Sequence, residues 1–130
     1  MCMAVRISIP LCAVGCEMHE LTLAESMMEI VESAAAQARV TKVTRVRLSI
    51  GALAHVESDA LLYCCEIVSR GGVAAGACFE VERPPGRAQC KVCEQEFVLN
   101  HLALGCPHCA AHNLLVLDGE QMKVVEIGVA

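Results

Sequence analysis

The sequence predicts an α+β protein with a small mixed three-stranded sheet, two helices and an inserted zinc ribbon closed by four cysteines. Two segments repeat apolar residues at helical spacing, three segments favour strands, and two C-x-x-C pairs interrupt the last part. The 130 residues are 55% apolar, which suits one small domain plus a metal-stabilised module. Aromatic residues make up only 2%, so we expect an aliphatic core.

The first helix is predicted from Thr22 to about Ala38. Thr22 and Glu25 match a capping box, in which each side chain accepts a hydrogen bond from a backbone N–H of the first turn. Apolar residues then follow at helical spacing: Leu23, Met27, Ile30, Val31 and Ala34.

Strands and a second helix account for most of the remaining regular structure. Residues 44–51, TRVRLSIG, alternate apolar with polar side chains, as a half-buried strand does. Ser58 suits the N-cap of the second helix, which a Gly-Gly pair would end, and residues 78–82 form the next strand. The last run, residues 123–129, should return to the first sheet.

The motif RPPG at residues 83–86 marks a module boundary. We expect an α/β domain over residues 18–84 and 120–130, with the zinc ribbon at 85–119. Residues 1–17 are expected to be disordered or to reflect a mis-assigned start codon, since Met18 opens the clean domain pattern. A signal segment is the weaker alternative, because Pro10 breaks the apolar stretch.

Two C-x-x-C pairs are separated by 12 residues and consist of Cys90, Cys93, Cys106 and Cys109. Zinc favours four tetrahedral thiolates, and two such turns complete that shell. Because no position remains for water or substrate, this zinc should be structural. Rubredoxin-like iron is the rival metal, and a disulfide framework among the ten cysteines is a further alternative.

Two histidines and three further cysteines have simpler interpretations. His101 and His108 lie in or beside the Cys module, where a histidine is usually solvated and becomes a ligand only if a cysteine is displaced. Cys64, Cys65 and Cys78 fall in predicted regular elements and are expected to be buried thiols.

The first helix is preceded by Met18, His19 and Glu20. A histidine there is ordinarily a solvated side chain. If Met18 is the first residue, its free amine, the backbone amides and the His19 imidazole can chelate Ni(II) or Cu(II) in a square plane, a geometry that zinc does not favour.

These motifs together resemble the HypA/HybF nickel-insertion proteins of [NiFe]-hydrogenase maturation. The resemblance rests on MHEL before an amphipathic helix, on VRLSIGALAHVE, on a second helix ending in SRGGVAAG, and on the two C-x-x-C pairs before a final strand. It extends from Met18 to about Ile127 and implies a small α/β nickel domain carrying a zinc ribbon.

The resemblance also implies a function and a nickel site. The protein would deliver Ni(II) to the hydrogenase large-subunit precursor, working with a HypB-type GTPase. The nickel ligands would be the Met18 amine, the His19 side chain and amide, and the Glu20 amide, with Glu57 nearby. The alternative for Glu57 is a charge at a helix N-terminus. His55 would be a nickel contact or an exposed loop residue.

The chain departs from the family pattern in the 17 residues before Met18. If they are present, His19 has no neighbouring free amine, and Cys2, Cys12 and Cys16 would offer a softer thiolate site. We therefore hypothesise that translation starts at Met18 or that the extension is removed.

The prediction is a nickel metallochaperone rather than an enzyme, since no nucleophile–base pair or phosphate loop is evident. A zinc-ribbon adaptor without nickel function is the alternative. The net charge of −5 without a basic stripe disfavours nucleic acid, and no apolar run approaches the roughly 18 residues of a membrane span. We expect a monomer or dimer in the cytoplasm.

Overall fold

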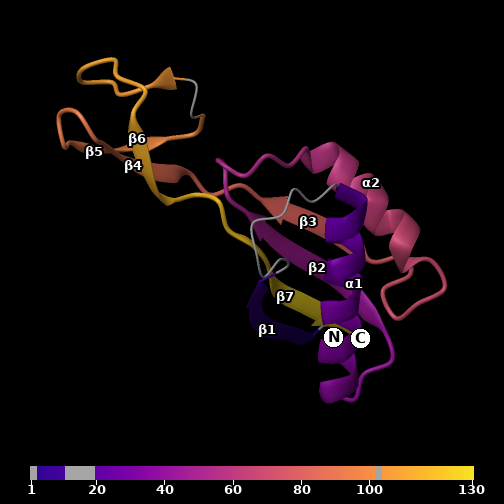
Figure 1. The fold of residues 1–130 in the computed structure, drawn as a ribbon. Coiled ribbons are helices and arrows are strands. Elements are labelled where there is room, and N and C mark those ends of the chain that lie inside the picture. Colours follow the sequence, from indigo (N-terminus) through magenta and orange to yellow (C-terminus); the bar gives the residue numbers. More distant parts are fainter. Residues whose placement is uncertain (1–2, 11–19, 102–103) are drawn as a thin grey trace. The chain divides into compact units, whose positions relative to one another are not determined.

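The computed structural model describes residues 3–10, 20–101 and 104–130 (Figure 1). The described chain divides into two compact units. The first takes residues from 1–49, 56–82 and 122–130, and the second comprises residues 50–55 and 83–121. Helices and strands occur together, so the predicted α+β class is confirmed.

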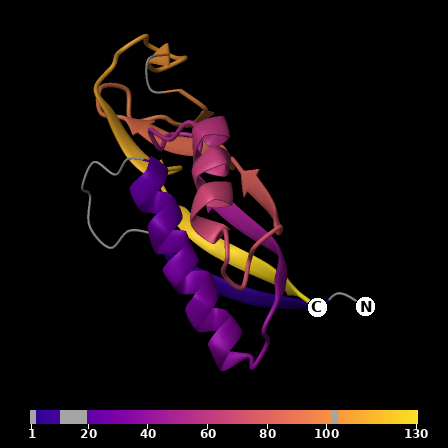
Figure 2. The same cartoon turned by 90° about the vertical axis from the view of Figure 1, so that its right-hand side faces the viewer.

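The first unit contains a four-stranded sheet with the order β1-β7-β2-β3. β1 pairs antiparallel with β7, and β2 pairs parallel with β3. The strands are β1 (Met3–Pro10), β2 (Val43–Ile50), β3 (Cys78–Glu82) and β7 (Met122–Val129). α2 (Ser58–Ser69) supplies the crossover that parallel strands require, and it packs against α1 (Glu20–Gln37). Figure 2 shows both helices on the same side of this sheet.

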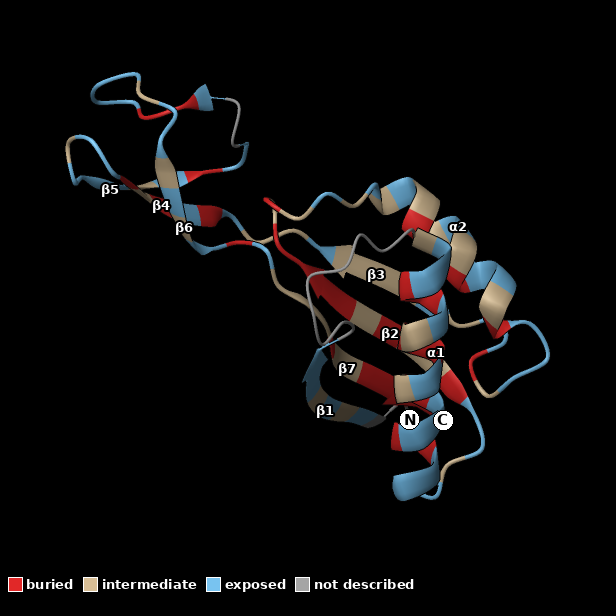
Figure 3. Cartoon of the chain, viewed as in Figure 1, coloured by how far each residue is buried: buried red, intermediate tan, exposed pale blue. Residues whose placement is uncertain are grey.

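The core of the first unit is aliphatic, as predicted. The buried residues lie on the sides of the helices and of the sheet that are turned toward each other (Figure 3). The fully buried side chains include Leu23, Met27, Val31, Val46, Leu48, Leu61, Val124 and Ile127, with the Cys65 thiol among them. No aromatic residue is buried in the described part of the chain. The spacing of apolar residues in α1 and β2 is therefore the pattern that forms this core.

Two predicted helix starts are wrong in detail. α1 begins at Glu20, so Thr22 lies inside the helix on its exposed side and does not cap it. The N-cap of α2 is Glu57 rather than Ser58, and its side chain accepts a hydrogen bond from the Asp59 N–H at 3.4 Å. The first turn of a helix has unpaired backbone N–H groups, and either the Glu57 carboxylate or the Ser58 hydroxyl can accept a hydrogen bond from one of them. The sequence is therefore compatible with a helix start at either residue. The predicted end is confirmed, with Gly71 at φ +75° just beyond the helix.

The sheet has four strands instead of the predicted three, because residues 3–10 form β1. The expectation of disorder is thus contradicted for these eight residues, whereas residues 11–17 lie outside the described part of the chain. β1 has little side-chain burial, but Val5, Ile7 and Ile9 alternate with Arg6 and Ser8 as in a half-buried strand, and β1 pairs with β7. This alternation indicates a strand, and the expectation of disorder overlooked it.

The second unit contains an antiparallel sheet with the order β5-β4-β6. Its strands are β4 (Gly86–Cys90), β5 (Glu96–Leu99) and β6 (Leu114–Asp118). Among its described residues, the buried apolar cluster consists of Leu53, Ala88 and Leu99, with Phe97, Leu114 and Val116 partly buried around them. Such a small core gives this unit little stability of its own.

Residues 50–55 are held in the second unit by backbone hydrogen bonds. Gly51 N–H donates to the Gln121 carbonyl at 2.7 Å, and Leu53 N–H donates to the Gly119 carbonyl at 2.8 Å. The approach is so close that a Cβ on Gly51 would lie 2.0 Å from the Gly119 oxygen. Only glycine permits this backbone contact at position 51.

Replacing Gly51 by alanine should destabilise the second unit by about 1–3 kcal/mol or more, because the added methyl forces the two backbones apart. Gly72→Ala is the matched control, since the nearest atom to a Cβ there lies at 3.5 Å. Hydrogen exchange of the residue 83–121 amides in both zinc-loaded variants checks this. Equal protection in the two variants would contradict the close approach.

Candidate metal centres

Four cysteine sulfurs converge in the second unit. The Sγ atoms of Cys90 and Cys109 lie 3.5 Å apart, and those of Cys93 and Cys106 lie 3.6 Å apart. All four ligand atoms lie within 4.8 Å of one another. Tetrahedral zinc with sulfur at 2.3 Å requires sulfurs about 3.8 Å apart, so this arrangement suits a single tetrahedral ion.

Backbone N–H groups point at the first sulfur of each C-x-x-C turn. The N–H groups of Val92 and Cys93 donate to the Cys90 Sγ at 3.4 and 3.5 Å. In the second turn the His108 N–H donates to the Cys106 Sγ at 3.4 Å. At Cys90 these donors favour the thiolate over the thiol, which is the form that binds a metal.

Each turn is closed by a residue in the left-handed region. Glu94 has φ 63° and Ala110 has φ 62°, and their N–H groups donate to the carbonyls of Cys90 and Cys106 at 2.9 and 2.8 Å. Neither residue is a glycine or asparagine, so the sequence carries no signal for these conformations. The sequence predicted the four sulfurs but missed the two residues that turn the chain back after each pair.

The ionisation of the thiols is uneven. The Cys93 N–H lowers the pKa of the Cys90 thiol to about 6. The Ala111 N–H lowers the pKa of Cys109, but the hydrogen bond with the Cys90 sulfur and burial outweigh it, and the pKa stands at about 12. The pKa of Cys93 is also raised: the Gln95 N–H lowers it, and burial with the Cys106 hydrogen bond outweighs that. One thiolate therefore forms readily, and its neighbours keep their protons until a cation replaces them.

This difference predicts how metal binding depends on pH. At pH 7 the metal-free chain holds Cys90 as thiolate, while Cys93 and Cys109 stay protonated and must release their protons to bind zinc. Each displaced proton contributes tenfold per pH unit, so the protons of Cys93 and Cys109 alone should lower the apparent zinc affinity by at least about 100-fold per pH unit between pH 8 and 6, and more steeply below 6, where Cys90 also protonates. Competition with a chromophoric chelator across this range measures the slope. A flat profile would contradict the ionisation states.

The histidines near the cysteine cluster are exposed. His108 contributes its backbone N–H to a sulfur, and His101 is exposed near β5. Within the described residues, the four cysteines are the only group of three or more side chains placed to hold one ion. A ligand role for either histidine stays a prediction.

Two of the four predicted nickel residues lie together in the first unit. The Glu57 N–H donates to the Glu20 Oε1 at 3.1 Å, which joins the first residue of α1 to the N-cap of α2. Met18 and His19 lie outside the described residues, and His55, which belongs to the other unit, is exposed. The alternative predicted for Glu57, a charge at a helix N-terminus, is confirmed as a cap, and its nickel role stays a prediction.

The remaining cysteines outside the cluster differ in exposure. Cys65 is buried. Its burial, and to a smaller extent the neighbouring Cys64, raises the pKa of its thiol to about 12. Cys64 is only half-buried, so the predicted burial is wrong for it. Cys78 is exposed, which contradicts the predicted burial, because β3 is an edge strand and Cys78 begins it.

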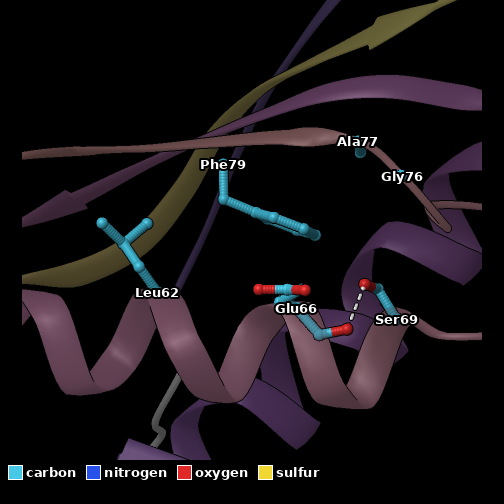
Figure 4. Close-up of a pocket in the computed structure, with 6 residues that line it drawn as sticks. All are labelled: Leu62, Glu66, Ser69, Gly76, Ala77 and Phe79. Atoms are coloured by element: carbon cyan, nitrogen blue, oxygen red, sulfur yellow. Dashed lines mark hydrogen bonds between the residues drawn. The ribbon is translucent and has the colours of Figure 1, made fainter.

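A pocket of about 350 Å³ lies between α2 and β3 (Figure 4). It is lined by Leu62, Glu66, Ser69, Gly76, Ala77 and Phe79. Its hydroxyl, Ser69 Oγ, donates to the Glu66 backbone carbonyl at 2.9 Å, and the Glu66 carboxylate pairs with Arg70 at 3.8 Å. The lining thus supplies no nucleophile paired with a base and no metal-ligand set.

The family model for hydrogenase/urease nickel incorporation, the HypA metallochaperone, matches residues 18–129. This chain belongs to the HypA family. The match contains the predicted nickel residues and all four clustered cysteines, so the resemblance inferred from the sequence is confirmed.

Relatives in the HypA family match nearly their whole length. The hydrogenase maturation factor HypA of Rhodopseudomonas palustris strain BisA53 is 41% identical over 112 residues, which covers 86% of this chain and 99% of the relative. That of Azotobacter chroococcum mcd 1 is 38% identical over the same coverage.

Solved HypA structures share the fold. The solution structure of the Ni metallochaperone HypA from Helicobacter pylori aligns with a TM-score of 0.63 at 21% identity, covering 86% of this chain and 97% of that one. A second HypA solution structure aligns with a TM-score of 0.61 at 21% identity, covering 88% and 98%. Neither helix described here is long and apolar enough to cross a membrane.

Proposed function

We propose that this chain is a nickel metallochaperone that delivers Ni(II) to the [NiFe]-hydrogenase large-subunit precursor. The observation that carries the proposal is the HypA family match over residues 18–129. Its relatives are named hydrogenase maturation factors, and HypA of Helicobacter pylori, which shares the fold, is described as a Ni metallochaperone. A metal carrier needs a site that binds the metal and releases it, and this role does not require catalytic residues.

The proposed nickel ligands are the Met18 amine, the His19 imidazole and amide, and the Glu20 amide, with the Glu57 carboxylate beside them. Deprotonated amides and an imidazole give the square-planar field that Ni(II) accepts. The hydrogen bond from the Glu57 N–H to the Glu20 carboxylate supports this assignment, because it holds the fourth residue next to the start of α1.

The proposed zinc ligands are Cys90, Cys93, Cys106 and Cys109. Four sulfurs fill a tetrahedral shell, so zinc would stabilise the fold of the second unit and would offer no open position to a substrate. The two metals therefore have separate roles in the proposal: a closed thiolate site for structure, and an open nitrogen-rich site for transport.

The proposal includes partners and a compartment. A HypB-type GTPase would act with this chain, and the hydrogenase precursor would receive the nickel, in the cytoplasm, where thiols stay reduced. We propose a monomer or a dimer as the working form. Incubating the nickel-loaded chain with the apo precursor, then separating the two and measuring the nickel on each, tests delivery directly.

The test of nickel binding uses the zinc-loaded chain that begins at Met18. Calorimetric titration should show one Ni(II) per chain in addition to zinc, at micromolar affinity, about −8 kcal/mol. His19→Ala should abolish this binding, whereas His112→Ala, which changes an exposed histidine of the second unit, should leave it intact. Nickel binding that survives in His19→Ala would contradict the assignment and leave the zinc-ribbon adaptor as the remaining function.

A further inference from the structure

The N-terminal extension forms a strand that the family match leaves out. The match begins at residue 18, whereas residues 3–10 form β1 at the end of the sheet. The alignment with the HypA relative from strain BisA53 covers 86% of this chain but 99% of the relative. The sheet order places β7 between β1 and β2, so β7 is the edge strand of the sheet when β1 is taken away.

β1 is attached through its backbone rather than through a core. Its register with β7 runs from Met3 opposite Val129 to Pro10 opposite Lys123. No described side chain of β1 is fully buried, and Ile9 is 41% exposed. Among the described elements, β7 is the only one with which β1 shares more than slight contact. The ladder of main-chain hydrogen bonds therefore provides most of the attachment.

β7 itself is anchored independently of β1. Its Val124, Ile127 and Val129 side chains are buried, and it packs against α1. The strand is thus held in place by the core, and its outward N–H and C=O groups form a preformed template for an added strand. Glu126 lies opposite Arg6 in the register, so the pair sets a basic residue against an acidic one, while the Glu126 carboxylate lies 3.9 Å from the Arg45 guanidinium on its other side.

The outer edge of β1 is poorly suited to further pairing. A register shift between Arg6 and Ile9 interrupts the ladder, and Pro10, which lacks an N–H, ends the strand. A charge, a bulge and a proline are the devices by which natural edge strands avoid pairing with other chains. The extension thus covers the edge of β7, which could pair with another strand, and leaves the edge of β1, which pairs poorly, at the end of the sheet.

We propose that the outer edge of β7 is a docking edge for an extended peptide, and that residues 3–10 are its built-in and releasable occupant. While β1 is docked, the strand of another chain is excluded from β7. Release of β1, or its loss together with residues 1–17, opens the edge to a β-branched segment that carries a basic residue opposite Glu126. This proposal does not depend on nickel and stands or falls separately from it.

The first test is amide hydrogen exchange on the full zinc-loaded chain. Val5→Pro with Arg6→Pro removes two consecutive N–H groups, and one of them must face β7 because donors alternate along a strand. We expect the outward amides of β7 to exchange about tenfold faster or more, while those of β3 at the other edge are unchanged. Val5→Thr with Arg6→Thr is the matched control, since threonine keeps the donors.

The second test adds the strand in trans. The chain beginning at Met18 should show the same fast exchange in β7, and an excess of the capped peptide MAVRISIP should slow it, whereas the peptide with prolines at positions 5 and 6 should not. Unchanged β7 exchange in the proline variant, or no slowing by the peptide, would overturn the proposal. Global unfolding of the proline variant would overturn it too, because β1 would then be part of the core structure.

Discussion

Replacing Cys106 by serine should leave the chain without bound zinc and should unfold its second unit. Cys106 is one of four sulfurs that lie within 4.8 Å of one another, and a serine hydroxyl does not replace a thiolate ligand. Loss of one ligand opens the tetrahedral shell. Zinc analysis of the purified protein and hydrogen exchange of residues 83–121 measure the two effects.

The effect is expected to be large because the metal replaces a core. In the part of the second unit that the structure describes, the buried apolar cluster contains just Leu53, Ala88 and Leu99. Structural zinc supplies an apparent free energy of about 10–16 kcal/mol in small zinc-binding peptides, which is folding free energy for such a segment. Burial of these three apolar side chains, at about 1.5–3 kcal/mol for each leucine, does not offset a loss of that size.

The control for this prediction is Cys78→Ser. Cys78 is exposed at the start of β3 in the first unit, outside the sulfur cluster. That variant should keep one zinc per chain and normal protection of residues 83–121. A Cys106→Ser protein that retains stoichiometric zinc would show that three cysteines suffice and that the closed four-sulfur shell is the wrong description.

The parts of the structure that follow from local pattern were the parts that could be predicted. Spacing alone identified the four cysteines that the fold brings together, because each C-x-x-C turn positions its own two sulfurs. Alternation predicted β2 and β3, and helical spacing predicted the buried side of α1. These signals share one physical origin, the separation of apolar from polar side chains by the period of the backbone.

The parts that depend on backbone pairing over long sequence separation could not be predicted. β1 pairs with β7 more than 100 residues away, and the alternation of apolar residues in β1 indicates a strand without specifying that partner. Gly51 meets Gly119 through backbone atoms, which leave no trace in hydropathy. The hydrogen bond between Glu20 and Glu57 joins residues 37 apart. The family resemblance named both of these glutamates for the nickel site, but only the fold shows that they lie together.

The 130-residue chain should bind nickel far more weakly than the chain that begins at Met18. In the longer chain the Met18 nitrogen is an amide within the polypeptide, so the amine that begins the proposed square plane is missing. Loss of groups that only support a ligand costs 10–100-fold in metal affinity, so loss of a ligand should cost about 100-fold or more. Titration of both zinc-loaded chains under the same conditions measures the ratio.

The pH dependence should separate the two chains as well. A free α-amine has a pKa of about 7.7–8.0, so nickel competes with a proton for it below that value. The affinity of the chain beginning at Met18 should therefore rise steeply between pH 6 and 8, and the acetylated form of that chain should behave like the 130-residue chain. Equal nickel affinity in the free, acetylated and extended forms would place the site elsewhere, since a ligand set that ignores the amine cannot begin at Met18.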